Sequence, residues 1–317
     1  MSYIAWMQSG RLPREEVGGK GASLAALIDA GFKVPAGFVV TAEGYRHFAK
    51  STGIDSRIAD ALAKLDASDA AAVRHATELI TGLVREMQLP DDLRSEIAAG
   101  YRELTDTQGV HAAVRSSALG EDGSAASFAG LYESYLNMVG EGEVLDAVHR
   151  CYVSLWAERA VSYRAGRTGG AEEAMAVVVM GLVPSETSGI AFTAHPVTGS
   201  LDQVIINASF GLGEAIVSGR VTPDSFLVDK NSFGILERKI YAKELAVYPH
   251  PEGGGGTVEE HLSPDRQREA SLTDEQACDV ARLATDVEKH YGSPQDIEWA
   301  LYEGTLYLLQ SRPITTL

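Results

Sequence analysis

The sequence contains, at residues 295–313, the stretch QDIEWALYEGTLYLLQSRP, on which the prediction of the fold depends. Two runs in which apolar residues alternate with others flank a Glu-Gly pair. Glycine there can take the positive φ that short hairpin loops require. The stretch therefore predicts a β-hairpin in which Ile297, Trp299 and Leu301 face a core.

The opposite face of this hairpin carries residues suited to chemistry. On its first strand the outward set is Asp296, Glu298 and Ala300. On the returning strand, Leu306, Leu308 and Gln310 alternate with Tyr307, Leu309 and Ser311. Glu298 and Gln310 can then lie side by side as an oxygen pair suited to Mg²⁺, with Arg312 near enough to hold phosphates around that ion. An ordinary edge hairpin with a polar outer face fits the same residues.

Length and composition indicate a folded chain of two lobes. The 317 residues are 45% hydrophobic and 22% charged, which is typical of globular proteins. The pattern changes from helix-rich to strand-rich at Pro184, so we expect an N-terminal lobe over 1–183 and a C-terminal lobe over 184–317. A net charge of −17 would repel a phosphate backbone, so we expect no nucleic-acid partner.

No membrane partner is expected, and the two cysteines are not expected to carry chemistry. The longest apolar run, Ala174–Pro184, is too short to cross a bilayer, and Met1–Glu16 has no signal-peptide pattern. These features predict a cytoplasmic location. Cys151 and Cys278 lie far apart without metal or redox spacing, which predicts two small core residues.

A glycine-rich segment near the start of the chain, VGGKGASLAAL at residues 17–27, predicts a turn that opens a helix ending at Gly31. Exposed amides and Lys20 at a helix start suit an anion. The segment is not a Walker A loop, because Arg14 and Gly21 occupy positions that such a loop needs for other residues. A flexible helix start with a solvated Lys20 is the alternative.

A second segment suited to phosphate is HAAVRSSA at residues 111–118, followed by a glycine-punctuated loop over 120–130. The first part predicts a strand that ends near Arg115. A loop of small residues lets main-chain amides approach a polyphosphate closely, while Arg115 supplies a fork-shaped charge. Pairing of Arg115 with Glu121 or Asp122 fits the same residues.

Two later segments have a weaker connection to function. The continuous apolar run Met175–Pro184 predicts a buried strand, which is compatible with lining an adenine slot. The segment NASFGLGEAIVSG at residues 207–219 is like a dinucleotide fingerprint only superficially, because Ile216 replaces its third glycine. Within it Glu214 is a candidate for reaching a site, with a surface acid as the alternative.

Helices are predicted over three further regions. The pattern from Ala42 to Leu104 is helical and predicts helices that cover a sheet. Glu143–Tyr163 predicts a packing helix, and Thr273–His290 a helix capped by Thr273 that leads into the hairpin. Further strands are expected at Gly189–Ala194, Val204–Ala208, Ser225–Val228 and Ile235–Tyr241.

Taken together, six motifs resemble one known family, the ATP-binding domain of phosphoenolpyruvate synthase, pyruvate phosphate dikinase and rifampin phosphotransferase. Their order and spacing carry the resemblance over essentially the whole chain. The motifs are VGGKGASL from Val17, VRSSA from Val114, ASFAG from Ala126, FTAHPVTG from Phe192, GLGEAIVSG from Gly211, and QDIEW through QSRP in the hairpin.

The resemblance implies an α+β ATP-grasp fold whose two lobes clamp ATP and Mg²⁺. It implies phosphate contacts from Lys20 and Arg115, covered by the loop through Ser127 and Gly130. It implies a main-chain contact of Leu182 with adenine near Met180, and a place for Glu214 in the ATP site. It further implies that Glu298 and Gln310 hold Mg²⁺ with support from Asp296, and that Arg312 stabilises the transferred group.

In this family ATP phosphorylates a histidine on a separate swivelling domain and yields AMP and phosphate, so the resemblance implies such a partner domain. It also implies chemistry by positioning and electrostatic stabilisation. Relatives continue beyond the point that corresponds to Leu317. We therefore expect either a piece of a longer protein or a separate ATP-binding subunit, as in phenylphosphate synthase. The final phosphate acceptor is not determined by this sequence.

Three positions depart from the family pattern. Met180 stands where a glutamine that helps to read adenine is usual, which leaves the purine preference open. His195 replaces an Asp or Asn, and Leu131 a common Gln. His195 lacks the small-residue context of the phosphorylated histidine and is not expected to take that role.

Two other functions remain open at this point. An ATP-grasp ligase would form an acyl phosphate and release ADP, although no extra substrate domain is recognisable. A non-catalytic nucleotide-binding module would not need the metal and phosphate residues that this sequence retains.

Overall fold

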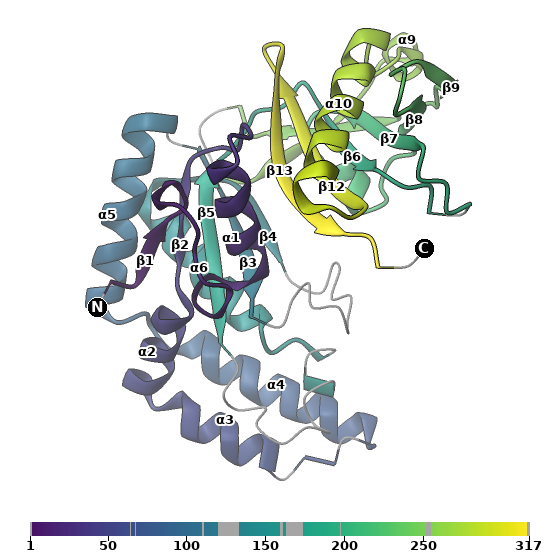
Figure 1. The fold of residues 1–317 in the computed structure, drawn as a ribbon. Helices are drawn as coiled ribbons and strands as arrows, with labels where there is room; N and C mark the ends of the chain where they lie inside the picture. Colours follow the sequence, from purple (N-terminus) through teal and green to yellow (C-terminus); the bar gives the residue numbers. More distant parts are fainter. Residues whose placement is uncertain are drawn as a thin grey trace. The chain divides into compact units, whose positions relative to one another are not determined.

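The computed structural model describes residues 2–63, 65–66, 68–109, 111–119, 133–158, 161–162, 174–196, 198–251 and 255–315 (Figure 1). The chain groups into two compact units. The first comprises Met1–Ala26 and Ala36–Gly181, and the second comprises Leu27–Pro35 and Leu182–Leu317. The lobe boundary after Val183 stays a prediction.

The first unit is built on a five-stranded antiparallel sheet. Its strands, in spatial order, are β1 (Ile4–Trp6), β2 (Gly37–Val40), β5 (Met175–Gly181), β3 (His111–Ala118) and β4 (Ser134–Val139). Every residue of β5 is buried, as the continuous apolar run predicts for a central strand. This strand lies at the centre of the sheet, between β2 and β3, and β3 with Arg115 lies between β5 and the edge strand β4.

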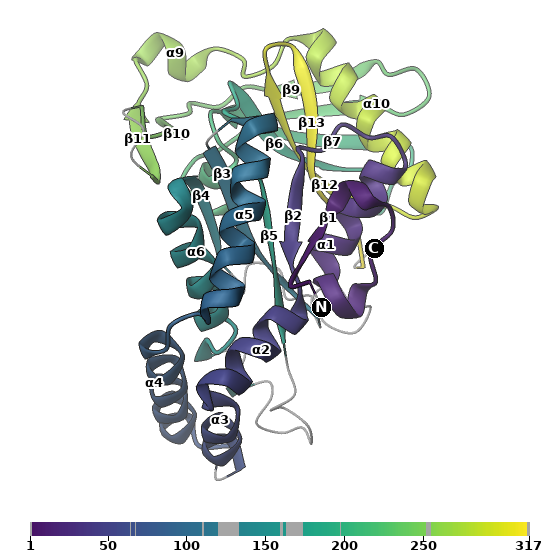
Figure 2. The same ribbon diagram turned by 90° about the vertical axis from the view of Figure 1, so that its left-hand side faces the viewer.

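The helices of the first unit pack on its sheet or on one another. They are α1 (Arg14–Asp29), α2 (Ala42–Thr52), α3 (Ile54–Ala63), α4 (Ala70–Glu86), α5 (Asp91–Gln108) and α6 (Gly140–Ser154), with a short 3-10 helix at Met7–Ser9. Alternate strand residues such as Val177 and Val179 pack with α2, α5 and α6 in one core. Figure 2 shows α5 lying across this face of the sheet, while α1 contacts the other face through Gly21 and Val39.

The second unit contains a six-stranded antiparallel sheet. Its order is β13 (Thr305–Pro313), β12 (Gln295–Tyr302), β6 (Thr187–Phe192), β7 (Gln203–Phe210), β8 (Asp224–Asp229) and β9 (Ile235–Lys239). A two-stranded ribbon adds β10 (Leu245–Pro249) and β11 (Thr257–His261), which the sequence did not indicate. The polar composition of β11 explains the omission, since it shows no apolar alternation.

The helix α10 (Asp274–Tyr291) packs on one face of the second sheet. Its Ala277, Ala281 and Ala284 lie in one core with Ile297 and Trp299 of β12. A capping box starts the helix: Thr273 accepts from the Gln276 amide, and Gln276 accepts from the Thr273 amide. The predicted helix start at Thr273 is thereby confirmed. Two short helices, α8 (Glu214–Val217) and α9 (Pro264–Arg268), complete this unit.

The end of α1 and the residues after it pack with the second unit. Leu27 lies in the core of that unit, and Phe32 and Val34 pack against the same core. The ring of Phe32 meets His290 of α10 edge-on, with 6.0 Å between centroids. No sequence pattern separates Leu27–Pro35 from the preceding residues of α1. Only its contacts therefore assign this segment to the second unit.

Candidate functional site

The closing hairpin forms as the sequence predicts. β12 and β13 are joined by Glu303 and Gly304, whose φ values of 48° and 71° are both positive, as a two-residue type I′ turn requires. Cross-strand pairing sets Glu298 directly opposite Gln310. A carboxylate and an amide oxygen thus lie side by side on one face of the sheet.

The returning strand departs from the expected strict alternation. Trp299 pairs with Leu308 but Glu298 pairs with Gln310, so Leu309 is an extra residue and the strand contains a β-bulge. Neighbouring residues of β12 point to opposite faces, and paired residues share a face. The expectation that Leu308 and Gln310 share a face is therefore wrong, because the bulge moves Gln310 to the face of Glu298.

The two faces of the hairpin differ in what covers them. Ile297, Trp299 and Leu301 are buried against the α10 core, which confirms their predicted orientation. On the other face Glu298 is half-buried, while Asp296 and Gln310 are 7% and 6% exposed. The oxygen atoms of this face therefore lie in partly desolvated surroundings, where a bound cation or anion is screened less by water.

Asp296 and Arg312 form an ion pair beside Glu298 and Gln310. The Nε and Nη2 atoms of Arg312 lie 2.8 Å and 2.6 Å from Oδ2 of Asp296. Burial raises the pKa of Asp296 above its usual range, Arg312 opposes this shift, and the charge of Glu298 adds to it. Arg312 thus offsets part of the cost of burying the Asp296 carboxylate, so the two side chains depend on each other.

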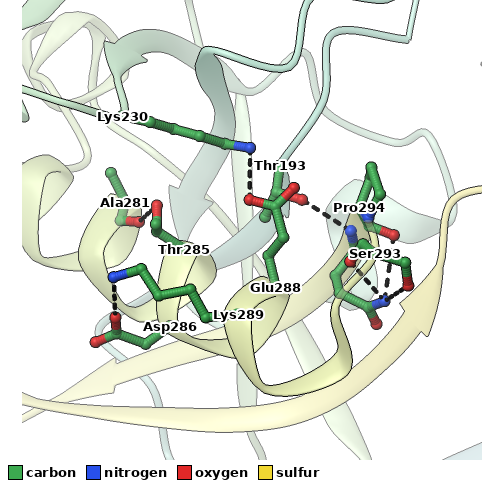
Figure 3. Close-up of polar contacts among 10 residues, drawn as sticks. Thr193, Lys230, Ala281, Thr285, Asp286, Glu288, Lys289, Ser293 and Pro294 are labelled. Carbon is green, nitrogen blue, oxygen red and sulfur yellow. Dashed lines mark hydrogen bonds and ion pairs between the residues drawn. The ribbon is translucent and has the colours of Figure 1, made fainter.

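Gln295 fixes the start of β12 through a fully bonded side chain. Its Nε2 donates to the main-chain oxygens of Ser293 and Pro294 and to the hydroxyl of Ser293, and its Oε1 accepts from Ser311 at 2.8 Å. Its main-chain N–H donates to the Thr193 hydroxyl at 2.8 Å; Figure 3 labels Thr193 together with Ser293 and Pro294. Since Gln295 precedes Asp296 and Ser311 precedes Arg312, these bonds fix the register of the ion pair.

In the first unit, the glycine-rich segment is anchored on β3. The helix α1 already starts at Arg14, and Gly18, with φ 71° and ψ 179°, interrupts it. A Cβ atom at Gly18 would lie 2.1 Å from the main-chain oxygen of Ser117. The Ser117 hydroxyl donates to the Val17 oxygen at 2.7 Å and accepts from the Gly21 amide at 3.1 Å. Gly18 thus separates two helical stretches that are joined in α1, and the glycine turn opens the second of them, as predicted; the first stretch, from Arg14, was not predicted.

This anchoring brings the two predicted phosphate-binding side chains into one region. Lys20 is next to Gly21, and Arg115 is two residues from Ser117, so both flank the same contact. Lys20 is 8% exposed and Arg115 is half-buried. Met180 is opposite Ala113 in the register, and so lies on the sheet face that also carries Arg115 and Ser117.

Other predicted site residues have varied surroundings. Leu182, half-buried, is the first residue of the segment that continues the second unit. Glu214 starts α8, where it pairs with Arg220 at 2.6 Å and accepts from the Thr257 hydroxyl at 3.2 Å. Arg220 also pairs with Glu259, so Glu214 ties α8 to the β10–β11 ribbon. Ser127, Gly130 and Leu131 lie outside the described residues.

The expected metal ligands do not form a complete binding site by themselves. Among the residues that the structure describes, no group of three or more His, Cys, Asp or Glu side chains is placed to hold a metal ion. Glu298 and Gln310 supply two hard oxygen donors, the type that Mg²⁺ prefers. Mg²⁺ commonly takes few protein ligands and completes its coordination shell with substrate phosphates and water. The pair of Glu298 and Gln310 is compatible with such a site.

Three positioning features were not predicted from the sequence. The first is the double contact of Ser117 with the glycine turn, and the second is the side-chain network of Gln295. The third is the bulge at Leu309. Ser117 and Gln295 both belong to motifs that the sequence indicates. The residues that they bond are distant in sequence, so only the folded structure identifies those partners.

Comparisons with known proteins agree on one family. The model of the family described as pyruvate phosphate dikinase, AMP/ATP-binding domain, matches residues 14–317. A phosphoenolpyruvate synthase of Pyrococcus furiosus is 41% identical over 99% of this chain and 44% of its own length. A rifampicin phosphotransferase of a Streptomyces species is 44% identical over 95% of this chain and 34% of its own length. The chain thus spans less than half of each relative.

None of the helices in the described ranges is long and apolar enough to cross a membrane.

Proposed function

Because the chain belongs to the pyruvate phosphate dikinase AMP/ATP-binding domain family, we propose that it binds Mg-ATP and phosphorylates a histidine on a separate domain. Membership of this family confirms the α+β, ATP-grasp fold expected from the sequence. In the proposed reaction, ATP and one water molecule yield AMP, inorganic phosphate and a phosphohistidine. The location in the cytoplasm stays a prediction.

The observation that carries this proposal is the register of the closing hairpin. It sets Glu298 opposite Gln310 and, two residues away on the same face, Asp296 opposite Arg312. The face therefore carries two oxygen donors as one cross-strand pair and a guanidinium in the next pair on the same face. This combination suits a metal-bound polyphosphate, since Mg²⁺ and Arg each bind phosphate oxygens.

Mg²⁺ fits the donor set of Glu298 and Gln310, and it would neutralise charge on the phosphates between which a bond breaks. Asp296 is the supporting acid. Its Oδ2 is bonded to Arg312, so it helps to orient the guanidinium and adds negative charge next to Glu298. Arg312 in turn stabilises charge on the transferred group.

The first unit supplies the proposed phosphate contacts. Lys20 and Arg115 flank the contact between the glycine turn and Ser117, and both bear the charge that phosphates attract. The loop through Ser127 and Gly130 is proposed to cover the phosphates. Main-chain groups at Leu182, with Met180 nearby in sequence, are proposed to meet adenine, and Glu214 is proposed to lie at the rim of the ATP site.

A partner domain with the acceptor histidine is part of the proposal. The chain spans 44% of the Pyrococcus furiosus relative, so more than half of that protein has no counterpart in these residues. We propose that the histidine belongs to such a further domain, present in the same protein or in a separate subunit. The final acceptor is the group to which that phosphohistidine passes its phosphoryl group.

The test is to identify the nucleotide product with and without an acceptor. The chain is incubated with Mg-ATP alone, with the histidine-bearing domain of a longer relative, and with that domain after its histidine is replaced by alanine. We expect AMP only with the intact histidine domain, together with acid-labile phosphate on that domain. In a matched reaction, Glu298→Gln is expected to lose AMP formation while the chain stays folded.

Two other products would contradict the proposal. ADP formed in the presence of a small carboxylate would indicate an acyl-phosphate-forming ligase. ATP that is bound but unchanged under every condition, including the reaction with the intact histidine domain, would indicate a nucleotide-binding module without catalytic function.

A further inference from the structure

We propose that Lys33 is a positioning residue that holds the bulge of β13 and thereby keeps Gln310 on the face of Glu298. The inference rests on the proposed function for the role of that pair, but the positioning itself rests on contacts within the second unit. Lys33 lies in the segment Leu27–Pro35, which follows α1 and packs with this unit.

The first step is that the segment around Lys33 is itself held in place. Leu27 is buried in the core of the second unit, and Phe32 and Val34 pack against that core on either side of Lys33. The amide of Val34 donates to the oxygen of Phe32 at 3.0 Å. Flanked by two anchored residues, the Lys33 carbonyl has a fixed direction, although its side chain is exposed.

The second step is a hydrogen bond to the edge of the sheet. β13 is an outer strand, with β12 on one side only. The Leu308 amide donates to the Lys33 oxygen at 2.9 Å. A main-chain donor at a sheet edge is thereby bonded within this unit, at the residue immediately before the bulge.

The third step is a contact between the two side chains beside that bond. The ammonium of Lys33 lies 5.1 Å from the ring centroid of Tyr307, within the range of a cation–π interaction. Tyr307 is paired with Ala300, so its ring lies on the face that carries Glu298. Lys33 therefore contacts β13 through its main chain at Leu308 and through its side chain at Tyr307.

These contacts fix the bulge from one end, while Gln295 fixes it from the other. Leu308 is opposite Trp299, and Ser311, bonded to Gln295, is opposite Ile297. Only Glu298 lies between those two partners on β12, whereas Leu309 and Gln310 lie between Leu308 and Ser311. With both ends held, the extra residue must be accommodated as a bulge.

Without the bulge, regular alternation would give Gln310 a different neighbour. Leu309 would face Glu298, and Gln310 would turn towards Ile297 and the α10 core. Gln310 would then leave the pair that we propose for Mg²⁺, and an amide would be buried against apolar residues. Weakening the contacts of Lys33 with β13 is therefore expected to weaken Mg²⁺ binding by Glu298 and Gln310, although neither ligand is removed.

The experiment compares Lys33→Ala, Lys33→Arg, Tyr307→Leu and the Lys33→Ala/Tyr307→Leu double variant. The matched control is Lys289→Ala, which removes an exposed lysine of the same unit that is paired with Asp286 (Figure 3). Two quantities are measured in each: the Mg²⁺ concentration that half-maximally strengthens ATP binding, and the hydrogen-exchange rates of the Leu308 and Gln310 amides. ATP affinity without Mg²⁺ is the reference.

We expect Lys33→Ala to raise the required Mg²⁺ concentration and the two exchange rates by about 2- to 5-fold, the size of an exposed cation–π contact. ATP affinity without Mg²⁺ stays unchanged, Lys33→Arg restores both quantities, and the double variant is no worse than the single ones. Lys289→Ala has no effect.

Unchanged exchange at Leu308 and Gln310 in Lys33→Ala would overturn the positioning role, as would an equal change in the Lys289→Ala control. Failure of the proposed function gives a different result. If Mg²⁺ has no effect on ATP binding by the unaltered chain, the metal role of Glu298 and Gln310 is wrong, while faster exchange in Lys33→Ala alone still supports the positioning of Gln310.

Discussion

The glycine turn of the first unit and the closing hairpin of the second unit hold their proposed site residues in different ways. The turn depends on close main-chain approach: Gly18 has no space for a side chain above Ser117. The hairpin depends on register, which side chains such as Gln295 and a one-residue bulge maintain. The first arrangement excludes any added atom at Gly18, whereas the second depends on which residues of β12 and β13 are paired.

The largest effect should come from adding one methyl group to the turn, in Gly18→Ala. The new Cβ would lie 2.1 Å from the Ser117 oxygen, and the φ of 71° strains any residue other than glycine. We expect a loss of about 2–4 kcal/mol in the free energy of unfolding and at least about 10-fold weaker ATP binding. Denaturant unfolding and calorimetric titration with ATP measure the two.

Gly10→Ala is the matched control. Gly10 has φ 96° and ψ −159°, which also favour glycine, but its added Cβ would meet nothing within 4 Å. Only the conformational strain, about 1–3 kcal/mol, should remain, with ATP affinity unchanged. Equal effects of the two substitutions on ATP binding would show that the close approach to Ser117 has no part in the site.

A smaller loss of stability is expected from Arg312→Ala in the hairpin. It leaves Asp296 buried without its arginine, which should lower stability by about 2 kcal/mol while the fold persists. Turnover in the reaction with the histidine domain should be abolished, because the guanidinium that we propose to stabilise charge on the transferred group is then absent. Unchanged activity in the AMP assay would exclude Arg312 from the site.

This loss of stability should depend on pH. Burial raises the pKa of Asp296 and Arg312 lowers it, so removing Arg312 raises the pKa further. A carboxyl with a raised folded-state pKa keeps its proton in the folded chain where the unfolded chain has lost it, so stability falls as the pH rises above the unfolded pKa. The deficit of Arg312→Ala should therefore be larger at about pH 7 than at about pH 4, as measured by urea unfolding; a pH-independent deficit would contradict this.

The smallest effect is expected from Ser117→Ala. It removes the hydrogen bonds to Val17 and from Gly21 but keeps the main-chain approach to Gly18. We expect a loss of about 1–2 kcal/mol and ATP binding weakened about 2- to 5-fold. Ser116→Ala, which removes one bond to the Glu133 oxygen, is the control and should leave ATP affinity unchanged. Equal ATP affinities in both variants would show that the side-chain bonds do not support the turn.

The regular elements were largely predictable because local patterns encode them. The apolar run of β5, the capped start of α10 and the Glu-Gly hairpin all have short-range signals in the residues that form them. Long-range contacts left no such signal. The placement of Leu27–Pro35 with the second unit and the pairing of β10 with β11 depend on residues far apart in the chain.

By itself, the sequence supplied the residues of the chemistry that we propose: Lys20 and Arg115 for phosphate, and Glu298, Gln310 and Arg312 on one hairpin. It also determined that β12 and β13 pair, since alternation and a turn glycine suffice for that. Only the tertiary structure decided how Gln310 comes to share a face with Glu298 while Leu308 faces the core. Leu308 and Ser311 are each held by distant partners, Lys33 and Gln295, and the extra residue between them forms a bulge that no local pattern specifies.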